Sequence, residues 1–241
     1  MSGFAQVSRV RGGASLTVFT LCAFGILIAL GVWQLERRTW KNDLIARFEA
    51  GLSQPPATYR PGANEFSHVR VKGEFLNPDT MKLLTPTPET ARAKTREGFG
   101  YQLFTPMKFD GGVVFVNRGF VPENLAATPS LFPEGVTEIA GIVRVPAKPG
   151  WFTPPPEPLK RVFFDADIPE MAAVAGLKTG DVIEREYIQA APVPNPSQWP
   201  EPRDPSDLLA SIPNRHLEYA LTWFGLAAAL AGVYAAYMLR R

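Results

Sequence analysis

The chain is poor in the residues that build covalent and metal-based sites. Its 241 residues include one cysteine, Cys22, and two histidines, His68 and His216. A single thiol excludes an intramolecular disulfide, a Cys-x-x-Cys redox centre and a thiol-bound c-type haem. Zinc sites built mainly from histidine and cysteine cannot be completed either, because Cys22 lies inside a long apolar run and only two histidines remain. A carboxylate metal site stays open, although no spacing of acidic residues indicates one.

The motifs of the large enzyme classes are also missing. The sequence has no Gly-x-Ser-x-Gly elbow, no Gly-x-x-x-x-Gly-Lys phosphate loop and no Gly-x-Gly-x-x-Gly dinucleotide loop. No set of acid, base and nucleophile converges in the sequence, so we expect no enzymatic activity, and a membrane-bound enzyme is the weakest alternative. When the four arginines near the two ends are left out of the count, the rest of the chain has 21 basic and 23 acidic residues. We therefore expect no nucleic-acid partner.

Proline is absent from two long apolar runs, although the chain contains 24 prolines. The runs cover residues 14–35 and 217–239. Each is about 22 residues long, or ~33 Å at helical rise, which matches a hydrocarbon core of about 30 Å. They predict a membrane hairpin of two transmembrane α-helices on either side of one domain.

Other interpretations of the two runs stay open. The first could be a cleaved signal peptide, with Ala29-Leu30-Gly31 as a weak cleavage site. Against this, the run is longer than a typical signal, and Trp33 and Trp40 resemble an interfacial aromatic belt. Either run could also be the buried helix of a soluble domain, and the second could be a simple anchor.

Basic residues set the expected orientation. The two tails contain no acidic residue and carry Arg9, Arg11, Arg240 and Arg241. Since basic residues concentrate on the cytoplasmic side, both termini should be cytoplasmic, although Arg37, Arg38 and Lys41 oppose this signal.

The expected organisation follows from that orientation. We expect a cytoplasmic N-terminal tail at 1–13, a first transmembrane helix at 14–35 and a periplasmic domain at 36–216. A second transmembrane helix at 217–239 and a cytoplasmic C-terminal tail at 240–241 should follow. The periplasm could equally be its mitochondrial equivalent.

The central region has the pattern of an α+β, mainly antiparallel β domain. Short segments rich in alternating or β-branched residues, bounded by Gly, Pro, Asn or Asp, predict strands at 68–75, 81–84, 101–105, 113–117, 137–145, 161–164 and 182–188. Asp110-Gly111-Gly112 predicts a hairpin turn. A helix is expected at 168–175, capped by Asp167.

Two further features concern the ends of the domain. Leu44, Ile45, Phe48 and Leu52 recur at helical spacing before Pro55-Pro56, which predicts an amphipathic extension of the first helix that docks onto the domain. The proline-rich stretches 146–158 and 192–205 are expected to be stiff loops.

His216 is the residue with the most chemical potential. A histidine at the mouth of a membrane helix is unfavourable without a partner or a function. It could be an ordinary interfacial residue beside Tyr219 and Trp223. It could equally be a haem ligand, with Arg215 pairing a propionate and small Ala220 on the same helix face leaving room for a macrocycle. His68, at the start of a strand, is expected to be an ordinary surface histidine.

Six blocks along the chain resemble those of the Surfeit-locus protein-one family. The first, Gly31-Val-Trp-Gln-Leu-Glu-Arg-Arg-Thr-Trp-Lys41, ends the first span. The others, in order, are Val71-Lys-Gly-Glu-Phe75, Gly100-Tyr-Gln-Leu-Phe-Thr-Pro106, Val116-Asn-Arg-Gly-Phe-Val-Pro122, Gly141-Ile-Val-Arg144 and Asn214-Arg-His-Leu-Glu-Tyr-Ala-Leu-Thr-Trp-Phe-Gly225. The resemblance covers about residues 31–237, and the stretch 192–212 resembles the family least.

The resemblance implies an assembly factor for cytochrome c oxidase in the inner membrane of a bacterium. It implies binding of haem a, with the iron on His216, and partners that include oxidase subunit I and haem A synthase. Residues near the helix mouths are expected to help bind the haem: Arg215, Trp223, Trp33, Arg37 and Trp40. On the first helix, Trp33, Gln34, Arg37 and Trp40 could line a groove between the helix mouths or only anchor the helix. The competing function is a cofactor-free scaffold that stabilises an oxidase assembly intermediate. For Arg118 and Gly119 we favour a structural role, as a strand end followed by a turn.

Overall fold

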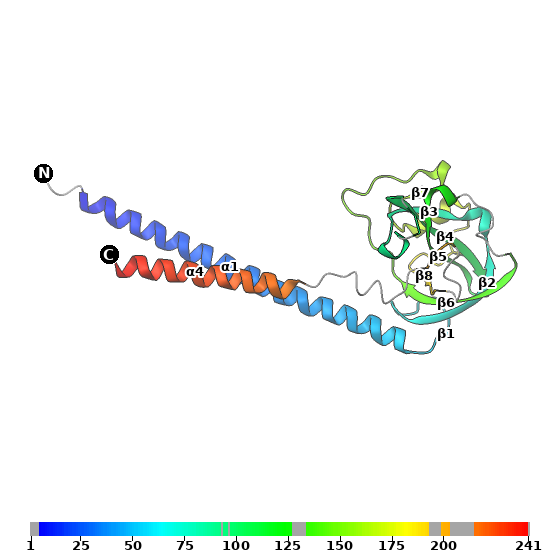
Figure 1. Cartoon of the computed structure of the whole chain (residues 1–241), viewed down its shortest axis with the longest axis horizontal. Coiled ribbons are helices and arrows are strands. Elements are labelled where there is room, and N and C mark those ends of the chain that lie inside the picture. The colour runs from blue at the N-terminus through cyan, green and yellow to red at the C-terminus, as the bar shows by residue number, and fades with distance from the viewer. Residues whose placement is uncertain are drawn as a thin grey trace. The chain divides into compact units, whose positions relative to one another are not determined.

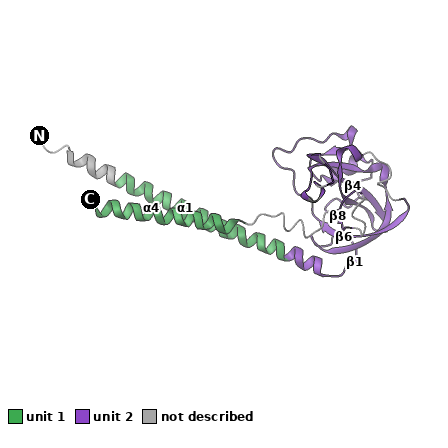
Figure 2. Cartoon of the chain, viewed as in Figure 1, with its two compact units in different colours: residues 1–46, 212–241 green, residues 47–211 purple. Residues whose placement is uncertain are grey.

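The chain forms two compact units. The structure, a computed structural model, describes residues 5–92, 94–95, 97–126, 134–192, 199–202 and 215–240. Residues 1–46 and 212–241 make up the first unit, and residues 47–211 the second (Figure 2). The predicted loop 192–205 lies largely outside the described residues.

Two long helices make up the first unit: α1 (Ala5–Ser53), whose last residues belong to the second unit, and α4 (His216–Leu239). Both are long and apolar enough to cross a membrane. Their large apolar side chains point outwards, as Val18, Phe19 and Leu21 show with exposed fractions of 61%, 70% and 63%. That exposure contradicts a buried helix of a soluble domain and suits a lipid environment.

The two helices run antiparallel and pack through a seam with a seven-residue repeat (Figure 1). On α1, buried or half-buried positions recur every seven residues in two series, 17, 24, 31, 38 and 20, 27, 34, 41. On α4 the matching positions include Ala220 and Ala227, each 1% exposed. Such a repeat is the geometry of paired helices in a left-handed coil. Because it brings Gly31 against the ring of Phe224, the helices approach closely there.

The second unit is a β-rich domain. Its strands are β1 (Ala57–Thr58), β2 (His68–Phe75), β3 (Met81–Pro86), β4 (Phe99–Phe109), β5 (Gly112–Pro122), β6 (Val136–Arg144), β7 (Val162–Phe163) and β8 (Tyr187–Ala190). Short 3₁₀ turns lie at Asn77–Asp79, Glu89–Ala91, Glu123–Leu125 and Pro158–Lys160, and α2 is Ile168–Val174.

Five of these strands close into a barrel. The sheet order is β1-β2-β6-β8-β5-β4-β3-β7, and β2 also pairs with β4 through Glu74↔Lys108 and Phe75↔Met107. This extra pairing joins β2, β6, β8, β5 and β4 into a ring, from which β1, β3 and β7 extend (Figure 1). Closure removes most of the unpaired sheet edge.

The domain has an apolar cluster on each side of the barrel wall. One cluster includes Val71, Met107, Val116 and Ile188, and Tyr59 packs against it. The other includes Phe104, Phe115 and Phe163 and is covered by α2. Since both faces of β5 are covered, nearly every residue of this strand is buried. This arrangement explains why the first half of β5, Val113-Val-Phe-Val116, is a continuous apolar run rather than an alternating one.

Several local predictions are confirmed. Asp167 accepts a hydrogen bond from the backbone N–H of Glu170 at 3.1 Å and caps α2. The turn before Gly112 joins β4 to β5, with a φ of +120° at Gly112. Phe48 near the end of α1 is 4% exposed and contacts Phe66, with ring centroids 4.9 Å apart, so the amphipathic extension does pack onto the domain.

The predicted strand at 182–188 is wrong for most of its length. Val182 makes a single isolated bridge to Val113, and the strand β8 begins only at Tyr187. Between them Glu186 is buried, where its Oε1 accepts hydrogen bonds from the Tyr59 hydroxyl at 2.7 Å and the Gly62 N–H at 2.9 Å. β8 then pairs in parallel with β5, and β1–β2 and β3–β7 are also parallel, so the pairing is antiparallel only in the main.

Candidate functional site

His216 lies on the seam between the two helices, where it is held by a side chain of α1. Its Nδ1 is 2.7 Å from Oε1 of Gln34. Because an amide oxygen only accepts hydrogen bonds, Nδ1 must carry the proton and donate. The imidazole lone pair is then on Nε2, which is buried and has no hydrogen-bond partner among the described residues.

The local sequence explains this placement. His216 is the first residue of α4, and Gln34 belongs to the seven-residue series that faces α4. Gly31 lies one turn before Gln34. A Cβ at this position would lie 2.5 Å from the ring of Phe224, so the close approach of the two helices requires a glycine here. The close approach of the helices brings the amide and the imidazole within hydrogen-bond distance.

Two basic residues of α1 act on the ring through their charge. Arg37 and Lys41 lie close enough to act electrostatically on His216. The Arg37 guanidinium stacks 4.0 Å above the centre of the Trp40 ring. Arg215 instead pairs with Glu218 on α4 at 3.2 Å, where both side chains are exposed. Arg37 and Lys41 are therefore the basic residues that this structure brings to His216.

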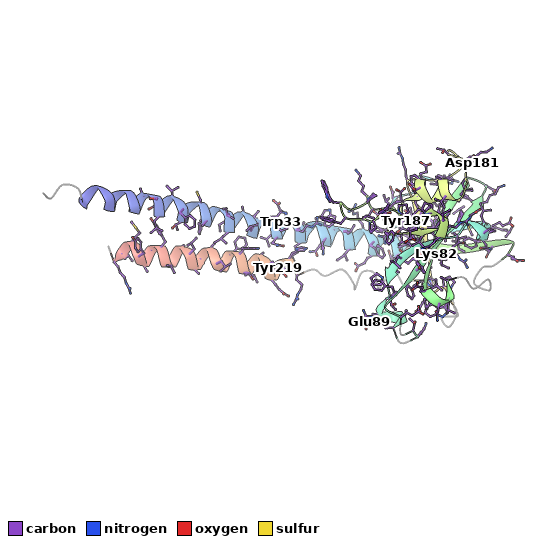
Figure 3. The ribbon with its side chains drawn as sticks, turned by 90° about the horizontal axis from the view of Figure 1, so that it is seen from above. Trp33, Lys82, Glu89, Asp181, Tyr187 and Tyr219 are labelled. Atoms are coloured by element: carbon purple, nitrogen blue, oxygen red, sulfur yellow. The ribbon has the colours of Figure 1, made fainter. Side chains whose placement is uncertain are left out.

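The tryptophans form two groups. Trp33, Arg37 and Trp40 share one stripe of α1 through their helical spacing, and the two rings are 53% and 45% exposed. Trp223 is half-buried on the seam of α4, and Tyr219 is 55% exposed (Figure 3, where Trp33 and Tyr219 are labelled). The stripe borders the seam and offers an exposed aromatic surface beside the Gln34–His216 pair.

Two expectations from the sequence turn out differently. Ala220 does not leave room for a planar ligand, because it is 1% exposed and buried within the helix pair. Gln34 was expected to line a groove between the helix mouths or to anchor the helix, and its hydrogen bond to His216 was not expected. Its seven-residue spacing from Leu27 and Lys41 is the signal that places it on the seam.

His68 contrasts with His216, since it is the first residue of β2, as expected. Its Nδ1 is 3.0 Å from the carbonyl oxygen of Gln54, and the contact is exposed. The described residues hold no group of three or more His, Cys, Asp or Glu side chains arranged for a metal ion.

The expected strand end at Arg118 and Gly119 is wrong, because both residues lie inside β5, which continues to Pro122, and the register between β4 and β5 shifts beside them. The unusual φ is confirmed: Gly119 adopts +116°, and a Cβ there would overlap the carbonyl oxygen of Glu201. Arg118 is 8% exposed with its guanidinium 4.9 Å from the centre of the Phe75 ring. Burial lowers the pKa of Arg118 to about 10, so that it stays charged at neutral pH.

These features define a protein with two candidate membrane spans around a closed β-barrel domain and a histidine fixed between the spans. Comparison with known proteins is consistent with this class. The SURF1 family model matches residues 21–228. The chain belongs to the SURF1 family.

Relatives come from both bacteria and animals. A SURF1-like protein of Rickettsia conorii is 32% identical over 90% of this chain and 88% of its own length. Surfeit locus protein 1 of Xenopus tropicalis is 29% identical over 94% of this chain and 78% of its own. Surfeit locus protein 1 of Homo sapiens is 28% identical over 89% of this chain and 73% of its own.

Proposed function

We propose that this protein is a membrane-bound assembly factor for cytochrome c oxidase, which holds haem a on His216 before the haem enters subunit I. Family membership and the two candidate spans support the general role. The proposal includes no enzymatic step: the haem is cargo, and the protein's contribution is to bind, orient and release it.

The observation that carries the haem site is the hydrogen bond from His216 to Gln34 at 2.7 Å. Histidines that ligate metals usually donate their other ring N–H to an oxygen, which fixes the tautomer and the ring orientation. Gln34 has this effect on Nδ1 and leaves the lone pair on Nε2, the atom that would bind iron. Since Nε2 is buried, the side chains that cover it have to move when haem binds.

The surroundings of His216 suit the two chemical halves of a haem. Arg37 and Lys41 provide positive charge for the propionates. Trp33, Trp40 and Trp223 provide flat apolar surface for the macrocycle. Arg215 joins this set only if it leaves Glu218, and that exposed ion pair is weak enough to exchange.

The proposed setting is the bacterial inner membrane, with both termini in the cytoplasm and the barrel domain in the periplasm. The acid-free, arginine-bearing tails support this orientation. Reporter fusions at residues 1 and 241 should both give cytoplasmic signals, and a fusion at Ala126 a periplasmic one. Opposite signals from the two ends would contradict the hairpin. Oxidase subunit I is the expected recipient, and haem A synthase the expected donor.

A cofactor-free scaffold is the second candidate, and one surface of the domain favours it. Trp151 and Phe152, in the proline-rich loop between β6 and β7, are 95% and 93% exposed. Exposed neighbouring aromatic side chains are typical of surfaces that contact another protein or a lipid. Such a contact would stabilise an assembly intermediate without any haem on His216.

Complementation distinguishes the two candidates. A bacterium that makes haem A and lacks its own family member would receive the wild type, His216→Ala or the matched control His68→Ala. The haem a band of the oxidase in membranes is then measured against the amount of subunit I. We expect His68→Ala to restore the band and His216→Ala to leave it reduced at normal protein level. Full restoration by His216→Ala would favour the scaffold over the haem carrier.

A further inference from the structure

The outer wall of the barrel contains a polar cavity of about 180 Å³. It lies across β4, β5, β6 and β8, and its polar lining comes from Gln102, Asn117, Arg144, Tyr187 and Gln189. Adjacent residues Val116, Val143 and Ile188 belong to the apolar cluster on the opposite side of the wall. Since side chains alternate along a strand, Asn117, Arg144 and Gln189 project from the outer face.

The strand register brings these side chains together. Asn117 pairs with Gln189 between β5 and β8, and Arg144 pairs with Tyr187 between β6 and β8. The ring of Tyr187 is fixed by Phe104, with ring centroids 5.1 Å apart. The cavity is thus built on paired strands rather than on loops, which holds its polar groups in place.

Some of the hydrogen-bonding capacity is already used within the wall. The Gly119 N–H donates to Asn117 Oδ1 at 3.1 Å, and Asn117 Nδ2 donates to Gln102 Oε1 at 2.7 Å. These two hydrogen bonds use the acceptor oxygens of both side-chain amides. It leaves the Gln102 amide nitrogen, a donor, for the cavity.

The remaining groups are also mainly donors. Arg144 Nε is buried without a hydrogen-bond partner among the described residues, and its ion pair with Glu65 spans 3.8 Å, too far for a hydrogen bond. Burial raises the pKa of Tyr187, so its hydroxyl keeps its proton at neutral pH. Gln189 is 6% exposed and adds an amide. A ligand for this cavity must therefore bring acceptors and few donors.

We propose that this cavity binds a carboxylate, with Arg144, Gln102 and Tyr187 donating to its oxygens. A carboxylate offers two acceptor oxygens and no donor, which complements the surplus of donors. It would also give Arg144 Nε the charge-assisted hydrogen bond that Glu65 does not make. The source could be a small organic acid or an acidic side chain of a protein partner, which share this chemistry. The site does not depend on the haem proposal, since all its residues belong to the barrel domain.

The test uses the ¹⁵N-labelled full chain in detergent micelles. Sodium propionate and propionamide are titrated at constant ionic strength, and the Gly119 amide, which donates to Asn117, is followed by NMR. A second pair of probes is the tripeptide Gly-Glu-Gly, blocked at both ends, and its Gln counterpart. We expect saturable shifts with propionate or the Glu peptide and none with the two amides. Whichever acid saturates at the lower concentration indicates the source.

Variants identify the residues. Tyr187→Phe keeps the ring contact with Phe104 and removes only the hydroxyl, and Arg144→Gln removes the charge. Each should weaken carboxylate binding about tenfold, the effect of losing one hydrogen bond to a charged group. Arg70→Gln, at an exposed arginine of β2, is the matched control and should leave binding unchanged. The proposal is overturned if no acid gives a saturable shift, if acid and amide shift Gly119 equally, or if Tyr187→Phe binds as tightly as the wild type.

Discussion

The helix pair and the barrel bury opposite kinds of residue. On α1, Phe19 is 70% exposed, whereas the seam partner Ala220 on α4 is 1% exposed. In the barrel domain, Phe104 and Phe115 are 1% and 0% exposed. In lipid, large apolar side chains gain nothing from being buried between helices, so small residues and hydrogen bonds hold the helices together. In water, the same aromatic side chains drive the formation of the core.

The two regions also differ in how their polar groups are hydrogen-bonded. Across the seam of the helix pair, Nδ1 of His216 donates to Gln34, and the hydroxyls of Thr17 and Tyr234 lie within hydrogen-bond distance, both at 2.7 Å. The barrel has connected groups, with Glu186 accepting from Tyr59 and Gly62 at once. Two donors on one buried carboxylate hold Glu186 in place within the barrel. On the proposal that His216 holds haem, the hydrogen bond to Gln34 instead orients a ring that has to exchange its ligand.

The largest effect is expected in the core of the barrel. Phe115→Ala should lower the free energy of unfolding of the domain by about 3–5 kcal/mol, because it removes a fully buried ring. Phe99→Ala, at a 56% exposed position of β4, is the matched control and should have a much smaller effect. Urea unfolding of the full chain in detergent measures both. Equal losses would show that Phe115 does not belong to the core.

On the seam, a larger side chain should destabilise the packing, as a smaller side chain does in the core of the barrel. Gly31→Val places a branched side chain where a Cβ already lies 2.5 Å from Phe224, which should destabilise the helix pair by ~1–3 kcal/mol. Gly25→Val, with nothing within 4 Å, is the control with the same helix propensity. Spin labels at Cys22 and at a cysteine replacing Val233 report the distance between the helices. An unchanged distance distribution in Gly31→Val would contradict the close packing.

The hydrogen bond to His216 should affect ligand affinity more than fold stability. Gln34→Leu removes the acceptor for Nδ1, and the loss of such an outer partner lowers metal affinity about 10–100-fold. Gln34→Glu keeps an acceptor oxygen and should retain most of the affinity. Titration of each variant with haem, followed by absorption, measures the effect. If the Gln34→Leu and Gln34→Glu variants bind haem with equal affinity, Gln34 has no part in the site.

The smallest effect concerns the buried tyrosine of the barrel. Burial, and then the hydrogen bond to Glu186, raise the pKa of Tyr59 above its ordinary value of 10.0. Folded protein then keeps a proton that unfolded protein releases, so stability is full below pH 10.0 and falls as the pH rises above it. The slope for one proton is about 1.4 kcal/mol per pH unit. Tyr59→Phe should lose this part of the slope in unfolding experiments, and an identical pH dependence would contradict the assignment.

The helices and most strands could be predicted because their signals are local. Proline-free apolar runs predict the spans, and Asp167 before Pro169 predicts the start of α2. Closure of the barrel could not be predicted, since it depends on the pairing of Phe75 with Met107, which are far apart in the sequence. The segment before β8 was misassigned because it is short and contains Val, Ile and Tyr, which are frequent in strands, whereas Glu186 turns inwards to Tyr59.

The candidate site was predicted only in part, for the same reason. His216 could be found because histidine is rare in this chain and this one begins a membrane helix. Its partner Gln34 is 182 residues away, and only the register of α1 against α4 brings them together. The polar cavity was missed because its lining comes from four strands. Its signal was present in single polar residues, such as Gln102 and Asn117, within apolar strand segments.

The haem content of the purified full chain tests the central claim most directly. The protein would be isolated from a host that makes haem A, and Soret absorption per chain would be compared for the wild type, His216→Ala and His68→Ala. The account predicts stoichiometric haem in the wild type and in His68→Ala, and a lower content or a shifted band in His216→Ala. Full haem content with an unaltered spectrum in His216→Ala would contradict it.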